Sequence, residues 1–193
     1  MNKRFLYLLL IFTSTLFLQS CSYNAIVSED EAVKKAWADV EASYQRRADL
    51  IGNLVETVKG EAKFEKETLT AVIEARAKAT SIQLNADEIT PENMEKFQQA
   101  QAQLSGALSR LLVVSEQYPN LKATEAFADL MNQLERTENR INVARRDYNA
   151  SVQTYNTKIR SFPANITAGL FKFKQREPFK ADPGSEKAPK VQF

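Results

Sequence analysis

The stretch that decides the fold is TEAFADLMNQLERTENRINVARRDYNASVQTYNTKIRSF, residues 124–162, which contains no proline or glycine. Large side chains recur in it every seven positions, at Phe127, Leu134, Ile141, Tyr148, Tyr155 and Phe162. A second row lies four positions further on, at Met131, Glu138, Arg145, Val152 and Ile159. Residues four apart share a helix face, so the two rows predict one amphipathic helix about 60 Å long. Such a helix is stable only when other helices cover that face.

Three earlier segments are predicted to supply the covering helices. The first starts at Ser28, the N-cap of a capping box closed by Glu31, and breaks or bends near Gly60. Its buried face is predicted to hold Trp37, Val40, Tyr44, Arg47, Ile51, Leu54 and Val58. The second spans residues 64–84, with Leu69, Val72, Ile73, Arg76 and Ala79 on one face. The third opens at Thr90-Pro91, because proline suits the first helical position after an N-cap threonine.

The third segment carries its apolar residues at coiled-coil spacing. It is predicted to end before Pro119, because proline disfavours a helical conformation of the preceding residue. Its predicted buried positions are Met94, Phe97, Gln101, Leu104, Leu108, Leu111, Ser115 and Tyr118. No stretch alternates with a period of two for long enough to indicate a sheet. The sequence therefore predicts an all-α protein, an antiparallel up-and-down four-helix bundle of long helices over residues 28–179. Residues 164–179 are apolar and should fold back over one end as a C-terminal wrap, followed by a disordered tail over 180–193.

The N-terminus has the pattern of a bacterial lipoprotein signal. Residues 1–20 combine the basic pair Lys3-Arg4 with an apolar run that is short for a membrane span. Leu18-Gln19-Ser20-Cys21 resembles a lipobox, in which the cysteine is lipidated and becomes the first residue after cleavage. Residues 21–27 would then be a spacer. The alternative is a free Cys21 thiol after an uncleaved anchor.

Charge and composition restrict the function. Removal of residues 1–20 takes away Lys3 and Arg4, which leaves 24 of the 26 basic residues against 24 acidic ones. A net charge of zero disfavours nucleic acid as a partner. The chain has no histidine, and its single cysteine is assigned to the lipid, so the commonest general base and the best nucleophile are missing. We therefore expect no enzyme activity, no cofactor and no metal site.

Polar residues occupy several positions of the predicted buried faces: Arg47, Gln101, Glu138 and Arg145. One interpretation is a polar layer that sets helix register, with Glu138 between Arg47 and Arg145. Another is a groove that binds a ligand or peptide at Asn139, Arg140, Arg145, Tyr148 and Asn149. A third is that the helix faces are misplaced. The pairs Tyr148-Asn149 and Tyr155-Asn156 are expected to pack and hydrogen bond across helices, or to present a surface to a partner.

Several motifs together resemble the LemA family. They are Arg46 to Val55 (RRADLIGNLV), Tyr118-Pro119 with Leu121-Lys122-Ala123, Thr137 to Ile141 (TENRI), Ala144-Arg145, the Tyr-Asn pairs, Phe162-Pro163 and Leu170-Phe171. The resemblance covers about residues 30–180 and implies a four-helix antiparallel bundle held at a bacterial membrane by its N-terminus. Gly52 stands where the family often has proline, and Lys172 and Pro178 replace a usual glycine and aromatic residue. The resemblance implies no biochemical activity.

The predicted function is a structural or interaction role as a lipid-anchored scaffold protein of the cell envelope, on the periplasmic side or the cell surface. Its predicted partners are the membrane, through the N-terminal lipid, and an envelope protein of unknown identity. The alternative is a binding module for a small molecule or cell-wall fragment in a polar groove of the bundle.

Overall fold

A computed structural model describes residues 3–61 and 64–180, with side chains from Ser22 onward. The described residues contain helices and no strands. The helices are α1 (Lys3–Lys59), α2 (Lys66–Ser81), α3 (Pro91–Ser115), α4 (Pro119–Lys122), α5 (Glu125–Arg160) and α6 (Ala164–Phe171), with a short 3₁₀ helix η1 (Ala86–Glu88) between α2 and α3. The all-α prediction is confirmed. Within the described ranges, no helix is long and apolar enough to cross a membrane.

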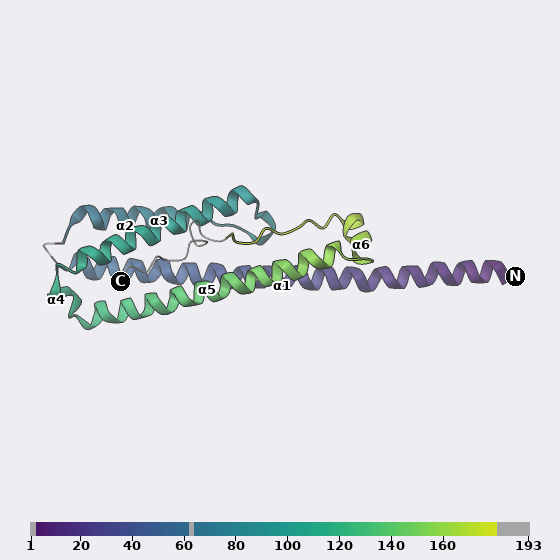
Figure 1. The fold of residues 1–193 in the computed structure, drawn as a ribbon, viewed down its shortest axis with the longest axis horizontal. Coiled ribbons are helices and arrows are strands. Elements are labelled where there is room, and N and C mark those ends of the chain that lie inside the picture. The colour runs from purple at the N-terminus through teal and green to yellow at the C-terminus, as the bar shows by residue number, and fades with distance from the viewer. Residues whose placement is uncertain (1–2, 62–63, 181–193) are drawn as a thin grey trace, which may run out of the picture.

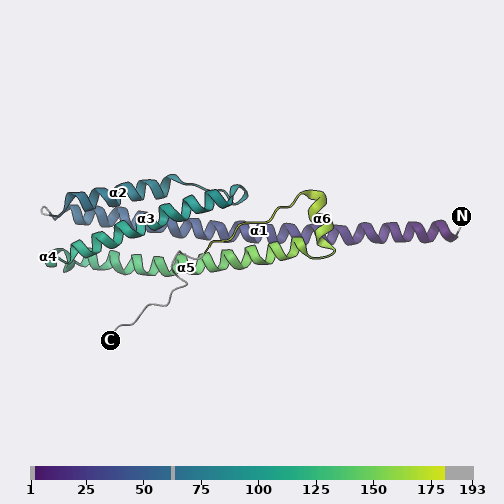
Figure 2. The same ribbon diagram turned by 45° about the horizontal axis from the view of Figure 1, so that its top comes forward.

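The four longest helices lie side by side and make an elongated body (Figures 1 and 2). Helix α1 runs the whole length, α5 packs along it in the opposite direction, and α2 and α3 form a hairpin over its C-terminal half. Helix α3 packs against α2 more than against α5, which leaves a groove between α3 and α5 with α1 as its floor. Helix α6 lies across the far end of the body, where α1 continues toward the N-terminus.

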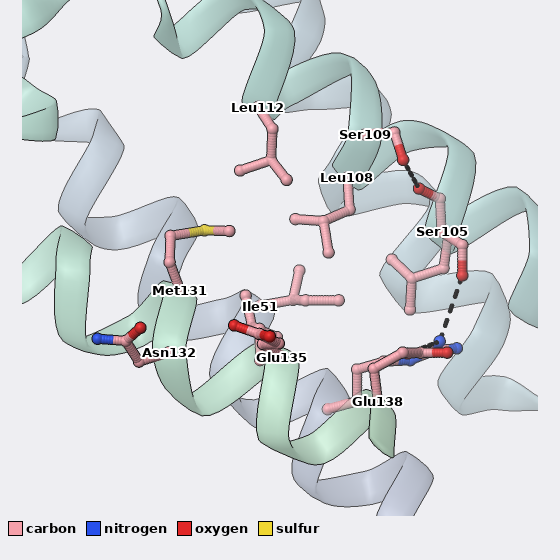
Figure 3. Close-up of a pocket in the computed structure, with 12 residues that line it drawn as sticks. Ile51, Ser105, Leu108, Ser109, Leu112, Met131, Asn132, Glu135 and Glu138 are labelled. Carbon is pink, nitrogen blue, oxygen red and sulfur yellow. Dashed lines mark hydrogen bonds and ion pairs between the residues drawn. The ribbon is translucent and has the colours of Figure 1, made fainter. Parts of the chain in front are cut away.

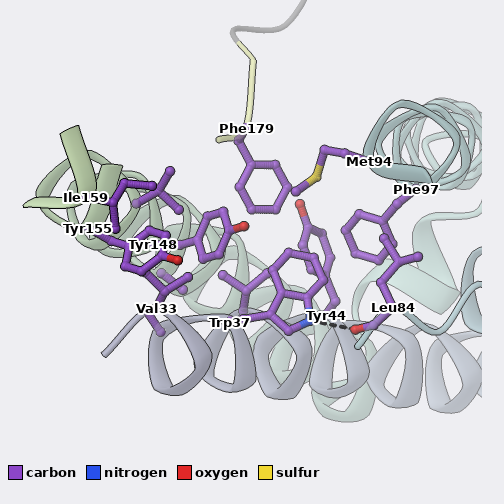
Figure 4. Close-up of a cluster of buried hydrophobic side chains, with 14 of the residues drawn as sticks. Val33, Trp37, Tyr44, Leu84, Met94, Phe97, Tyr148, Tyr155, Ile159 and Phe179 are labelled. Carbon is purple, nitrogen blue, oxygen red and sulfur yellow. Dashed lines mark hydrogen bonds between the residues drawn. The ribbon is translucent and has the colours of Figure 1, made fainter. Parts of the chain in front are cut away.

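The core forms two clusters along this body. One holds the aromatic side chains of α1, α3 and α5, including Trp37, Phe97, Tyr148 and Tyr155 (Figure 4). The Trp37 indole donates to the Leu84 carbonyl at 2.7 Å, which ties the loop after α2 to α1. The other cluster is aliphatic and lies toward α4, and Ile51 and Leu111 are 0% exposed within it. Burial of both clusters is the main term that stabilises the body.

The predicted cap at Thr90 is confirmed, and Thr124 caps α5 in the same way although no cap was predicted there. Thr90 Oγ1 accepts from the Asn93 backbone N–H, and Thr124 Oγ1 accepts from that of Phe127. The break near Gly60 is also confirmed, because α1 ends at Lys59. In α2, Ile73 was expected on the buried face but is 42% exposed.

The predicted helix start at Ser28 is wrong. Helix α1 continues without interruption through Ser28 and through the predicted spacer at residues 21–27. Residues 22–27 contain no proline or glycine to stop the helix, and Ile26 is completely buried in the aromatic cluster. Packing of this turn therefore outweighs the local capping signal at Ser28.

The predicted buried face of α5 is only partly correct. Phe127, Leu134, Ile141, Tyr148 and Tyr155 are all buried, but α5 ends at Arg160, and Phe162 is 81% exposed. Glu138 is exposed, and the buried companions in this half of the helix are Thr137 and Ala144, three positions after the heptad residues. The row four positions later becomes buried at Val152 and Ile159.

Candidate functional site

A buried arginine at the centre of the body joins three of the long helices. Arg47 on α1 is 4% exposed. Its Nη1 donates to Ser105 Oγ on α3 at 3.2 Å and to Glu138 Oε2 on α5 at 3.1 Å, and its Nη2 donates to the amide oxygen of Gln101 on α3. Gln101 in turn donates to the Ala79 carbonyl of α2 at 3.5 Å. These four side chains form the polar layer, which brings Arg47 and Glu138 together as expected.

The polar layer leaves part of the guanidinium group without a protein partner. Arg47 Cζ lies 5.0 Å from the centre of the Tyr44 ring, within the range of a cation–π contact. Arg47 Nε is buried, yet no hydrogen-bond acceptor among the described residues reaches it. The ion pair is asymmetric, because the Arg47 side chain is 5% exposed and that of Glu138 is 51% exposed. Water can therefore screen the carboxylate, but not the arginine.

Two cavities meet at the polar layer. Arg47, Ser105 and Glu138 line both of them, so the layer is their common wall. The first cavity, of about 450 Å³, extends toward α4 between α3 and α5, with Ile51 of α1 at its base (Figure 3). Its remaining lining is mainly apolar: Leu104, Leu108, Leu112, Met131 and Leu134, with Ser109, Asn132 and Glu135. The first cavity can therefore accept an apolar group whose polar end meets Arg47 and Glu138.

The second cavity, of about 640 Å³, lies on the other side of the layer and is lined mostly by polar side chains. Its lining includes Glu95, Gln98, Gln99, Gln101 and Arg145, together with Lys180 of the C-terminal segment. The Lys180 carbonyl accepts from Gln98 Nε2 at 3.2 Å and from Arg145 Nη2 at 3.3 Å. The chain's own C-terminal segment therefore forms part of the wall of this cavity.

Three of the residues predicted as a ligand or peptide groove on α5, Arg145, Tyr148 and Asn149, hold that C-terminal segment. The Tyr148 hydroxyl donates to the Glu177 carbonyl at 2.9 Å. The Asn149 amide accepts from the Phe179 N–H at 2.8 Å and donates to the Phe179 carbonyl at 3.2 Å. Asn156 repeats this pair of bonds seven residues later, with both backbone groups of Arg176 at 2.9 Å. The asparagines of the two Tyr-Asn pairs therefore bind the backbone of residues 176–179.

Phe179 anchors the segment in the aromatic cluster. Its ring stacks on Trp37 at 5.8 Å and meets Tyr148 edge-on at 5.5 Å (Figure 4). The Arg145 guanidinium lies 5.0 Å from the centre of the same ring. Arg145 was expected to share Glu138 with Arg47. It is instead engaged with the C-terminal segment, whose path the heptad pattern does not reveal.

Arg176 forms the second anchor of the segment. Its guanidinium donates to Asp30 Oδ1 of α1 at 2.7 Å, to Asp87 Oδ1 at 2.6 Å and to the Ala86 carbonyl of η1 at 2.7 Å. The hydrogen bond from Arg176 is the main cause of the lowered pKa of Asp87. Burial raises the pKa of the nearby Tyr148 hydroxyl to about 12, so Tyr148 remains a neutral donor at physiological pH.

Sequence comparisons relate this chain to known proteins. The profile of the LemA family matches residues 36–193, which is most of the chain. The chain belongs to the LemA family. Among its relatives, magnetosome protein MamQ 2 of Paramagnetospirillum magneticum is 27% identical over 194 residues, covering 91% of this chain and 70% of the relative. Magnetosome protein MamQ of Magnetospirillum gryphiswaldense is 26% identical over 197 residues, covering 92% and 71%. Protein LemA of Metamycoplasma hominis is 25% identical over 145 residues, covering 75% and 63%.

The remaining predicted site residues of this LemA-family chain are not part of the polar layer. Asn139 and Arg140 are exposed on α5, and neither lines either of the two cavities. Cys21 falls within α1, but its side chain lies outside the described residues, so its lipidation stays a prediction. Residues 181–193 of the predicted tail also lie outside the described part.

The site in this chain also contains residues that were not predicted from the sequence. Ser105 is one, because a serine on a mostly apolar helix face gives no signal of its own. Asp30, Asp87 and Arg176 are others, since their contacts depend on chain segments far apart in the sequence. Gln101 was recognised as a polar intrusion, and the structure places it beside Arg47.

Proposed function

We propose that this protein is a lipid-anchored, non-catalytic scaffold of the cell envelope whose long helices act as an antiparallel four-helix bundle. The observation that supports this role best is the groove between α3 and α5. It opens along the body, and its apolar cavity ends at a charged wall, Arg47 with Glu138. Grooves with apolar side chains and a few polar ones suit an amphipathic helix or peptide of a partner.

The anchor is proposed from the N-terminal sequence. Cys21 is the single cysteine of the chain and follows an apolar run in the order of a lipobox. One acyl chain gives only reversible membrane binding, but a lipobox cysteine carries a diacylglyceryl group, which provides two. The protein would therefore remain on the membrane surface without a spanning helix.

Cys21→Ala is expected to abolish lipid attachment. The variant should remain an unprocessed precursor that takes up no labelled fatty acid, while the parent chain is labelled and shortened. The measurement is metabolic labelling followed by mass determination, with Ser20→Ala as a control that keeps a small residue before the cysteine. Fatty-acid label on the Cys21→Ala chain would show that the lipid-anchor proposal is wrong.

Partner binding in the groove is expected to give site-specific photo-cross-links. Leu112 lines the apolar cavity, whereas Val113 is 70% exposed and does not line either of the two cavities at the polar layer. A photoreactive amino acid at position 112 should give a discrete cross-linked product in intact envelope membranes. The same group at position 113 is the matched control and should give much less. Equal products at both positions would contradict groove binding.

A second candidate function is supported by the polar cavity. The unpartnered Arg47 Nε and the neighbouring Arg145 could recognise an anionic small molecule or cell-wall fragment there. In the cross-linking experiment this function would give no protein product at position 112. A purified chain that binds soluble cell-wall fragments, and loses this binding on Gln98→Ala, would favour it.

A further inference from the structure

Helix α6 presents an apolar surface to solvent. Its inner side, Ala164, Thr167 and Ala168, is buried against the body. Its outer side carries Ile166, Leu170 and Phe171, which are 55%, 68% and 55% exposed, and Phe162 just before it is 81% exposed. Exposed aliphatic and aromatic side chains that cluster at one place mark an interaction site, whereas isolated ones do not.

This surface lies where α1 leaves the body toward the N-terminus. Figures 1 and 2 both show α6 lying across the body at that end. The Phe171 ring is 4.8 Å from the ring of Tyr23 on α1, and Phe173 is 5.9 Å from it. The left-handed conformation of Lys172, with φ of 59°, turns the chain back so that both phenylalanines reach Tyr23. Helix α6 therefore lies beside α1 at the position of Tyr23.

Tyr23 is close to the point of membrane attachment in either form of the anchor. It lies two residues after Cys21 and five after Leu18, the last residue of the apolar run. Two residues of α-helix rise by about 3 Å and five by about 8 Å, which is comparable with the thickness of one interfacial layer, about 5–8 Å. A membrane that holds the N-terminus therefore reaches α6.

The charged residues next to α6 in the sequence are all basic. Residues 148–176 contain no aspartate or glutamate, but they contain Lys158, Arg160, Lys172 and Lys174 in addition to the clamped Arg176. Lys172, Lys174 and Arg160 are exposed. Residues 5–28 of α1 carry no charge at all. An apolar surface with a basic rim matches the interface of a membrane that contains anionic lipids.

We propose that α6 and Phe162 insert into the interfacial layer of the membrane that holds the N-terminus. The exposed lysines and Arg160 contact anionic headgroups, while Ile166, Leu170 and Phe171 reach the acyl boundary. An eight-residue helix binds a bilayer weakly on its own, but the nearby anchor raises its effective concentration at the surface. A second copy of this chain is a poorer occupant, because a symmetric contact would bring two basic rims together. The inference rests on the membrane anchor proposed above.

The test uses the full chain on vesicles and an environment-sensitive fluorophore attached to Leu170→Cys. The matched control is Val113→Cys, a side chain of similar exposure (70% against 68%) on α3. The unsubstituted chain is treated with the same reagent to measure any labelling of Cys21. Vesicles contain phosphatidylcholine alone or with one third phosphatidylglycerol, and flotation measures attachment separately from the label. Each label is quenched from water with iodide and from the bilayer with a lipid-borne nitroxide.

On anionic vesicles the label at position 170 should be quenched by the lipid nitroxide and be severalfold less accessible to iodide than the label at 113. Adding Lys172→Glu and Lys174→Glu should abolish this severalfold difference in iodide accessibility, while the chain still floats with the vesicles. If the chain floats and the label at 170 behaves like that at 113, the α6 inference is overturned and the anchor stands. Protection from iodide without quenching by the lipid nitroxide would assign the surface to another protein copy and also overturn it. A chain that does not float overturns the anchor and the inference together.

Discussion

Phe179→Ala should be among the most destabilising single substitutions in this protein, lowering the free energy of unfolding by about 3 kcal/mol. Phe179 is 5% exposed, and its ring contacts Trp37, Tyr148 and Arg145. Without the Phe179 ring, the hydrogen bonds between Asn149 and the backbone of residue 179 are no longer held in place by a buried side chain. We expect this value at the lower end for a buried phenylalanine, because residues 172–180 can detach while the helices stay packed.

Urea unfolding of the full chain in detergent, followed by circular dichroism, would measure this loss. Trp37 is the single tryptophan and lies against Phe179, so its emission should also shift to longer wavelength in the folded variant. Phe162→Ala is the control, since a side chain that is 81% exposed in the absence of a membrane should change stability by less than about 0.5 kcal/mol. Equal effects of the two substitutions would mean that Phe179 does not pack in the core.

Arg47→Ala is expected to cost a similar amount, about 3 kcal/mol, because it removes a long buried side chain and its bonds to α3 and α5. Arg47→Met keeps most of the volume without the charge and should recover the larger part of this loss. Glu138→Ala should cost only about 1 kcal/mol, since Glu138 is half exposed and water can reach the site it vacates.

Thermal melts of the three variants measure these losses, and binding measurements on the stable Arg47→Met variant separate the two interpretations of the polar layer. If the layer sets register, Arg47→Met should form a stable body with unchanged cross-linking at position 112. If Arg47 binds a ligand, the same stable variant should lose binding of that ligand. An Arg47→Ala protein as stable as the parent would show that Arg47 does not occupy the buried position described for it.

The accuracy of the sequence predictions depended on how local each signal was. The predicted N-cap at Thr90 is local, and the structure contains it. The predicted start at Ser28 is equally local, but packing of Ile26 extends α1 past it. The buried positions predicted for α5 were partly wrong for a geometric reason. A seven-residue repeat drifts by about 20° per heptad around a straight helix, so the row four positions later begins at the solvent edge and reaches the core only at Val152.

The site was predictable only where both partners lay on regular helices. Arg47 and Glu138 each interrupt an apolar row, and this shared irregularity indicated that they meet. The partners of Arg145, Tyr148 and Asn149 could not be found this way, because residues 173–180 form neither helix nor strand and follow no periodicity. The position of such a segment is set by single anchors such as Arg176 and Phe179, whose partners are far apart in sequence.

The uninterrupted helix α1 also fixes the distance between the N-terminal anchor and the polar layer. No proline or glycine precedes Gly52, so the helix has no built-in hinge between its N-terminal end and the polar layer. Arg47 lies 26 residues beyond Cys21, which corresponds to about 39 Å along the helix axis. If α6 holds the body upright, the groove stands at a constant height of about 40 Å above the point of attachment. A partner anchored in the same membrane would then need a stalk of matching length, and a change in the length of α1 would alter which partners can reach the groove.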